Sequence, residues 1–160
     1  MTARVSFPSL FLAIAASTLL AAPALAQSQK AQPTKAERII RYRQSALYLL
    51  GWNIGPVGAM VKGEIPFDAK AVELRASRLA EIAPMILEGF PADSQTGAPT
   101  KAKPEIWQNM DDFRAKAADL ERATAKFAQT AKSGDPKQVA AGLGEVGGAC
   151  KACHDKYKAD

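Results

Sequence analysis

The segment Cys150-Lys151-Ala152-Cys153-His154, close to the C-terminal end of the chain, constrains the fold more than any other stretch. Its pattern, C-x-x-C-H, is typical of c-type haem attachment, in which two thiols bond to one porphyrin and the adjacent histidine reaches the iron. If the segment is helical, the two cysteines lie one turn apart on one side. The chain has no other cysteine or histidine. The sequence therefore predicts one covalent haem c, with His154 as the axial iron ligand.

Two other chemistries use a pair of cysteines and remain alternatives. In an exported protein, two cysteines can form a disulfide or a redox-active dithiol. A thioredoxin-like dithiol follows a strand, however, and no strand pattern precedes Cys150. A structural zinc site takes four ligands, and the chain offers only these three cysteine and histidine side chains. Haem is the favoured prediction because it alone uses all three residues at this spacing.

The first 26 residues have the pattern of a secretory signal peptide. Arg4 supplies the charged start, a mostly apolar run covers residues 10–22, and residues 24–26 form a small-x-small cleavage site. The apolar run is short for a membrane span of about 20 residues. We therefore predict a signal peptide over residues 1–26 that is cleaved on export to the periplasm, and no membrane attachment after cleavage.

Charge is dispersed along the chain. The sequence holds 21 Lys and Arg against 16 Asp and Glu, a formal charge of +5. It contains no basic run with interleaved aromatic residues, so we expect no nucleic-acid partner. The mild positive charge is compatible with acidic redox proteins as partners. After the signal peptide, we expect a disordered N-terminus over residues 27–33 and one domain over residues 34–160.

Helical periodicity and end signals predict four helices. The expected helices are Thr34 to Gly63 with a kink at Pro56, Asp68 to Gly89 with a kink at Pro84, Pro104 to Gly134, and a last helix from Asp135 through the cysteine motif. The apolar seam predicted for the first helix is Ile40, Leu47, Leu50, Ile54, Val57 and Val61. No stretch alternates with the period of a strand. The predicted fold class is all-α, an antiparallel up-down-up-down four-helix bundle that encloses a covalently bound haem.

With these features the chain resembles cytochrome c prime, the four-helix-bundle c-type cytochromes of bacterial periplasms. Four segments carry the resemblance, in the family's order and spacing: RQSAL at residues 43–47, KGEIPFD at 62–68, PEIW at 104–107 and GACKACHDKYK at 148–158. Together they cover nearly all of the predicted mature chain, which makes the match far more specific than the C-x-x-C-H pattern alone.

The resemblance implies which residues hold the haem. Cys150 and Cys153 form the thioether bonds, while Arg43 and Gln44 lie against the haem and its propionates. Without the resemblance, a solvated helix charge is the favoured explanation of Arg43. Weaker candidates border the haem just before Pro104: Thr100, Lys101 and Lys103.

The resemblance also implies what stands on either side of the iron. His154 is the proximal ligand, and Leu47 matches the distal position, where low-spin relatives carry a ligating methionine. The methionines of the predicted mature chain stand elsewhere, at Met60, Met85 and Met110. A leucine cannot ligate iron, so we expect a five-coordinate, high-spin or spin-mixed iron. One departure from the family is Lys158, at a position that is often arginine. Lysine keeps the positive charge but lacks the planar fork of donors that arginine has.

These features favour a non-enzymatic haem protein that binds NO or CO, carries single electrons, or does both. An apolar distal wall supplies neither a hydrogen bond to O₂ nor a base for peroxide cleavage, which weighs against oxygen storage and a peroxidase. The alternatives are a low-spin electron-transfer cytochrome of the same fold and a haem enzyme that converts peroxide or NO. The resemblance also implies a homodimer built on the first two helices, with Tyr48 and Trp52 as candidates for the contact.

Overall fold

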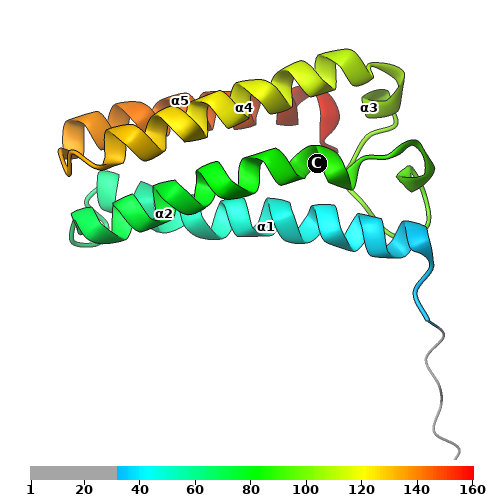
Figure 1. Cartoon of the computed structure of the whole chain (residues 1–160), viewed down its shortest axis with the longest axis horizontal. Helices are drawn as coiled ribbons and strands as arrows, with labels where there is room; N and C mark the ends of the chain where they lie inside the picture. The colour runs from blue at the N-terminus through cyan, green and yellow to red at the C-terminus, as the bar shows by residue number, and fades with distance from the viewer. Residues whose placement is uncertain (1–31) are drawn as a thin grey trace, which may run out of the picture. The chain divides into compact units, whose positions relative to one another are not determined.

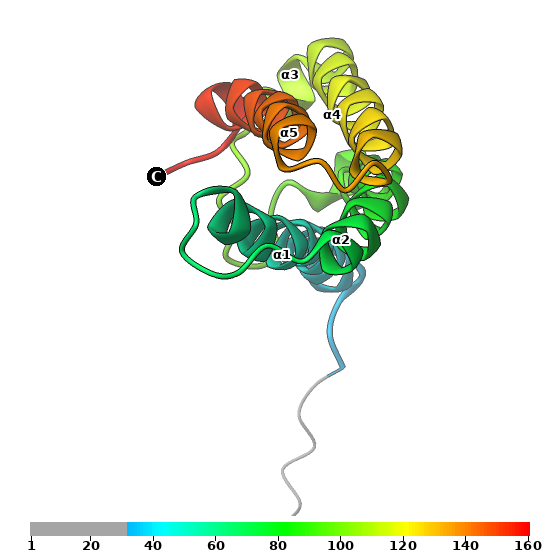
Figure 2. The same ribbon diagram turned by 90° about the vertical axis from the view of Figure 1, so that its left-hand side faces the viewer.

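The computed structural model describes residues 32–160. The predicted signal peptide over residues 1–26 lies outside the described residues, as does most of the predicted disordered N-terminus over 27–33. In chain order the elements are α1 (Lys35–Val61), α2 (Ala69–Ile82), η1 (Ala83–Gly89), η2 (Ala92–Ser94), α3 (Glu105–Gln108), α4 (Met110–Ala131) and α5 (Pro136–Tyr157). The four long helices run side by side, and the end-on view shows them in the order α1, α2, α4, α5 around a common centre (Figures 1 and 2). The predicted all-α four-helix bundle is confirmed.

The helix starts follow from side-chain caps that the sequence predicts. At α1, Thr34 Oγ1 accepts a hydrogen bond from the Glu37 amide (3.2 Å), and a Glu37 carboxylate oxygen accepts one from the Thr34 amide (2.6 Å). Asp68 caps α2 and Asp135 caps α5 in the same manner, each accepting from two backbone amides. These bonds satisfy amides that have no partner inside a helix. The turn before α5 closes through Gly134, whose φ of 65° favours glycine.

Two predicted helices differ from the structure at their ends. The α-helix of the second ends at Ile82, and residues 83–89 continue as the 3₁₀ helix η1. Pro84 explains the change because it has no amide proton for a helical bond and its ring crowds the preceding turn. The third predicted helix is interrupted at Asn109, which has φ −131° and ψ 47°. The Asn109 amide and side chain both donate to the Glu105 carbonyl (3.0 Å each), which closes the short α3 before α4 begins.

The core lies where the four long helices face one another. Its fully or nearly fully buried members include Ile40, Val57, Val72, Leu79, Ile106, Phe113, Phe127, Val139 and Val146. Within α2, α4 and α5 these residues are 7 or 14 positions apart, which places them on one face of each helix. No helix among residues 32–160 is long and apolar enough to cross a membrane.

Candidate haem-binding site

A cavity of about 610 Å³ lies between α1, α4 and α5, and the loop at residues 100–102 borders it. Eight of the nine residues that the sequence analysis assigned to the haem site line this cavity: Arg43, Gln44, Leu47, Thr100, Lys101, Cys150, Cys153 and His154. Lys103 does not line it. The remaining wall is mainly apolar, so residues that are distant in the sequence together form a large, mostly hydrophobic site.

The cysteine motif is helical and belongs to the last turns of α5. Cys150 and Cys153 are half-buried free thiols that face the cavity, and burial raises the pKa of both. They form no disulfide with each other. Among residues 32–160, no three His, Cys, Asp or Glu side chains are arranged to hold a metal ion by themselves. The arrangement thus presents two thiols one helical turn apart to one cavity, as thioether attachment requires.

His154 follows the second thiol and also lines the cavity. Loss of hydration, and next the positive charge of Lys158, lower the pKa of this imidazole. Both influences favour the neutral form, which is the form that binds metals. The end of α5 is held to the loop at residues 101–103 by hydrogen bonds from the Lys103 amide to the Tyr157 carbonyl (3.0 Å) and from the Ala159 amide to the Lys101 carbonyl (2.8 Å).

Tyr157 fixes the same end of α5 against α4. Its side chain is 2% exposed, its hydroxyl donates to a carboxylate oxygen of Asp112 (2.5 Å), and its ring meets Phe113 edge-on with centroids 5.3 Å apart. Lys156 reaches the same Asp112 oxygen (2.9 Å). The helix segment that carries the two thiols and the imidazole is therefore anchored beyond the motif.

Arg43 is buried in the bundle, with 1% of its surface exposed. It is therefore not a solvated helix charge. Its guanidinium carbon stands over the rings of Phe90 (5.0 Å) and Trp107 (5.5 Å). Gly89 makes the burial possible, because a Cβ at Gly89 would approach the Arg43 Cβ to 2.4 Å. Burial lowers the pKa of Arg43, but arginine remains protonated in proteins, so a positive charge lies inside the fold.

The hydrogen bonds of Arg43 leave part of its guanidinium free. Nη1 donates to the Gly89 carbonyl (3.3 Å) and to the carbonyl (2.8 Å) and Oγ (3.1 Å) of Ser94, and Nη2 donates to Thr100 Oγ1 (3.1 Å). Nε is buried and has no partner. Arg43 also forms no ion pair within the described part of the chain. A buried cation with an unused donor is the feature that an anionic group in the cavity would satisfy.

Gln44 lies one residue beyond Arg43 and is exposed toward the loop. Its side-chain nitrogen donates to the Pro99 carbonyl (2.9 Å), which links α1 to the segment that leads to Thr100. Thr100 Oγ1 accepts both from Arg43 and from the Ala102 amide (3.2 Å). The sequence did not indicate the contacts of Arg43 and Gln44 with this segment, because each joins residues more than 50 positions apart.

Leu47 lines the cavity from α1 and is 39% exposed. It stands on the cavity wall rather than in the buried face of α1. The buried face of α1 is instead formed by Ile40, Arg43, Ala46, Leu50, Asn53 and Val57. Arg43 thus belongs to the buried face of α1, covered by the aromatic and polar groups described above, and Leu47 borders the cavity.

Four cationic residues line the cavity, at Arg43, Lys101, Lys116 and Lys158, and no Asp or Glu of residues 32–160 does. None of the four forms an ion pair in that part of the chain. Sequence reasoning missed Lys116, although it stands three residues after Phe113 and thus on nearly the same face of α4. A mainly apolar cavity with uncompensated positive charge fits haem, which combines an apolar macrocycle with two carboxylates.

Comparisons with known proteins agree with this site. A family model described as "Cytochrome C'" matches residues 38–158. Cytochrome c' of Rubrivivax gelatinosus is 40% identical over 119 residues, which covers 74% of this chain and 92% of the relative. A crystal structure of that organism's cytochrome c' covers 80% of this chain and all of its own, with a TM-score of 0.75 and 38% identity. A nitric oxide complex of a variant cytochrome c prime from Alcaligenes xylosoxidans covers 81% of this chain and all of its own, with a TM-score of 0.73 and 31% identity.

Proposed function

Because the chain belongs to the cytochrome c' family and so carries one covalent haem c, we propose that it is a periplasmic cytochrome that binds NO and CO and carries single electrons at a five-coordinate iron. The observation that carries this proposal is the composition of the cavity wall. Leu47 stands there, and none of Met60, Met85 and Met110 does. With no thioether available from those side chains, His154 is the ligand that the chain supplies.

In this proposal each cavity residue has a defined task. Cys150 and Cys153 hold the porphyrin through thioethers, and His154 binds the iron from α5. Arg43 and Gln44, with Lys101 as a weaker candidate, face the haem carboxylates. When bound, haem supplies an iron that takes up one electron and coordinates a diatomic gas. The protein excludes water with its apolar wall and leaves Leu47 as the side chain that an entering gas must displace.

Two findings support gas binding as a role without catalysis. Solved structures similar to this chain include nitric oxide complexes of cytochrome c prime. The α1 wall beyond Arg43 and Gln44 is mostly apolar, with Leu50, Gly51 and Ile54 next to Leu47. Such a wall accommodates a small uncharged gas but provides no general base for peroxide or NO conversion.

The coordination state is tested by absorption and EPR spectra of the purified ferric and ferrous protein, before and after addition of CO. We expect a high-spin or spin-mixed ferric signal, no sulfur-to-iron band, and a ferrous spectrum that changes when CO is added. A low-spin ferric spectrum with a sulfur-to-iron band would contradict the five-coordinate proposal and favour the low-spin electron carrier of the same fold.

Electron transfer is the second candidate role, and the cations around the cavity favour it. Lys101 and Lys158 are exposed and Lys116 is partly exposed, and none is paired with an acid in the described residues. Positive charge beside a redox group steers acidic partners toward it. A periplasmic redox protein with an acidic surface is therefore the partner class that we propose.

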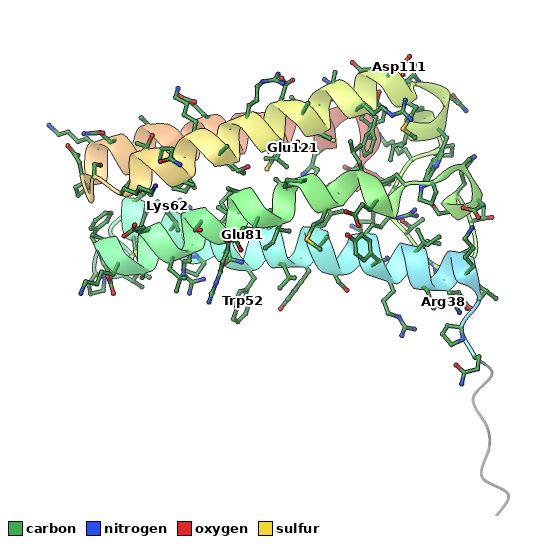
Figure 3. All side chains as sticks on the ribbon, viewed as in Figure 1. Arg38, Trp52, Lys62, Glu81, Asp111 and Glu121 are labelled. Carbon is green, nitrogen blue, oxygen red and sulfur yellow. The ribbon has the colours of Figure 1, made fainter. Side chains whose placement is uncertain are left out.

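We also propose a homodimer formed through the exposed part of α1 around Trp52 and Tyr48, the second of which also borders the cavity. Tyr48 is 66% exposed and Trp52 60% exposed, and their rings stack with centroids 6.3 Å apart. Leu49 extends the patch and is 45% exposed. Trp52 projects from α1 away from α4 and α5 (Figure 3). Clustered exposed aromatic side chains are typical of association surfaces.

Trp52→Glu is expected to shift the protein from dimer to monomer, since it places a charge at the centre of this apolar patch. Light scattering at micromolar concentration measures the mass. Ala125→Glu, which adds the same charge on the exposed face of α4, is the matched control and should leave the dimer intact. A monomer mass for the unaltered protein would contradict the dimer proposal.

A further inference from the structure

Ser94 is a polar residue that the attachment motif does not explain. It ends η2, in the long segment between η1 and α3, and none of its surface is exposed. A buried hydroxyl is costly unless it is hydrogen-bonded. Its partners therefore indicate its role.

The hydroxyl of Ser94 can only accept from Arg43. A serine hydroxyl has one proton, and Ser94 Oγ donates it to the Pro91 carbonyl (2.8 Å). The same oxygen then accepts a hydrogen bond from Arg43 Nη1 (3.1 Å), and the Ser94 carbonyl accepts a second one from that nitrogen (2.8 Å). Trp107 Nε1 also donates to the Pro91 carbonyl (3.0 Å), so the acceptor that orients the hydroxyl is itself held in place.

The bonds at Nη1 determine which donors of Arg43 remain available. Three acceptors, two of them on Ser94, occupy Nη1. Nη2 has one bond, to Thr100, and Nε has none. A guanidinium has five N–H donors, and two adjacent ones match a carboxylate. The edge formed by Nε and Nη2 thus keeps the donors that a carboxylate requires.

We propose that Ser94 is a positioning residue for the haem cavity, which holds the Nη1 end of Arg43 so that Nε and Nη2 are presented to a haem carboxylate. This inference rests on the proposed function, since it requires haem in the cavity. A simpler account is that the rings of Phe90 and Trp107 hold Arg43 without help from Ser94. The two accounts differ in what the loss of one hydroxyl does to the electrostatics of the haem.

The reduction potential reports the position of Arg43. A cation fixed beside the haem favours the reduced form, because that form carries one less positive charge. Ser94→Ala removes one of the three acceptors and leaves the carbonyls of Ser94 and Gly89, so the cation should become less confined. We expect the one-electron equilibrium constant to shift about threefold toward the oxidised form, which is about 28 mV at 59 mV per tenfold change.

The experiment is a potentiometric titration of the haem-loaded protein and four variants. Ser94→Ala tests the hydroxyl, and Ser77→Ala on the exposed face of α2 is the matched control, which should keep the original potential. Arg43→Met removes the charge, and the double variant shows whether Ser94 acts through Arg43. In the Arg43→Met background, Ser94→Ala should cause no further shift. Should Ser94→Ala fail to fold, Ser94→Cys keeps nearly the same volume with a weaker acceptor and should lower the potential in the same direction.

Two results would overturn the proposal. One is a potential for Ser94→Ala equal to that of the unaltered protein, which would leave the aromatic rings as the holder of Arg43. The other is the same shift with and without Arg43, which would show that Ser94 acts on packing alone. Neither result affects the proposed function, which fails separately if the unaltered protein has no covalent haem or has a low-spin spectrum.

Discussion

Haem should become extractable with acidified acetone when Cys150 and Cys153 are both replaced by serine, whereas the unaltered protein should retain it. The reason is chemical: serine forms no thioether, and the cavity then holds the porphyrin only by apolar contacts and by its cations. Each single variant should retain one bond and attach haem less completely. Mass spectrometry of the denatured protein measures the covalent fraction directly.

His154→Ala provides the contrasting variant for this prediction. It leaves both thiols in place, so covalent attachment should persist while the iron loses its protein ligand and the absorption spectrum changes. The two sets of variants thereby separate attachment from ligation. Complete extraction of haem from the unaltered protein would exclude the attachment proposal and return the disulfide or dithiol to consideration.

CO association should become more than about tenfold faster in Leu47→Ala, which corresponds to a barrier lowered by about 1.4 kcal/mol. The substitution removes three carbon atoms from the cavity wall on α1. Because Leu47 lines the cavity that haem would fill, the loss of folding free energy in the haem-loaded protein should be about 2–5 kcal/mol, the range for a buried leucine. Stopped-flow mixing with CO gives the rate, and chemical denaturation gives the free energy of unfolding.

Leu47→Met and Leu74→Ala complete this test. A thioether at residue 47 is expected to ligate the iron, make the spectrum low-spin and slow CO binding, because CO must then displace it. Leu74, 52% exposed on α2 and outside the cavity lining, is the control for loss of a leucine elsewhere and should leave CO binding unchanged. An unchanged CO association rate in Leu47→Ala would place the barrier to gas entry at another side chain.

Local signals predicted the helices well because their causes are local. A capping residue bonds to amides two or three positions away, as Asp68 does with Lys70 and Ala71. The spacing of apolar residues follows from the helical repeat itself. The attachment motif is also local, since one helical turn holds both thiols and the imidazole. Asn109 shows the limit of these local signals. The predicted third helix continues through this position, but the backbone angles of Asn109 are not helical.

The environment of Arg43 required the folded chain. In the sequence it is a charged residue on an amphipathic helix, for which solvent exposure is the usual outcome. Its burial depends on acceptors 46 to 57 positions away, at Gly89, Ser94 and Thr100. No spacing rule reaches that far, because the loop that carries these acceptors has no repeating pattern. The resemblance suggested Arg43 as a haem contact but gave no reason for its burial.

The same distinction separates the motif from the cavity. Residues 150–154 predict a covalent haem because the chemistry of attachment needs only adjacent positions in one helix. The shape and charge of the cavity depend on three helices and a loop, and Lys116 and Leu47 acquire their roles only when these elements meet. Burial is a property of the whole packed bundle, so a local pattern predicts which residues are apolar but not which of them face the core and which line the cavity.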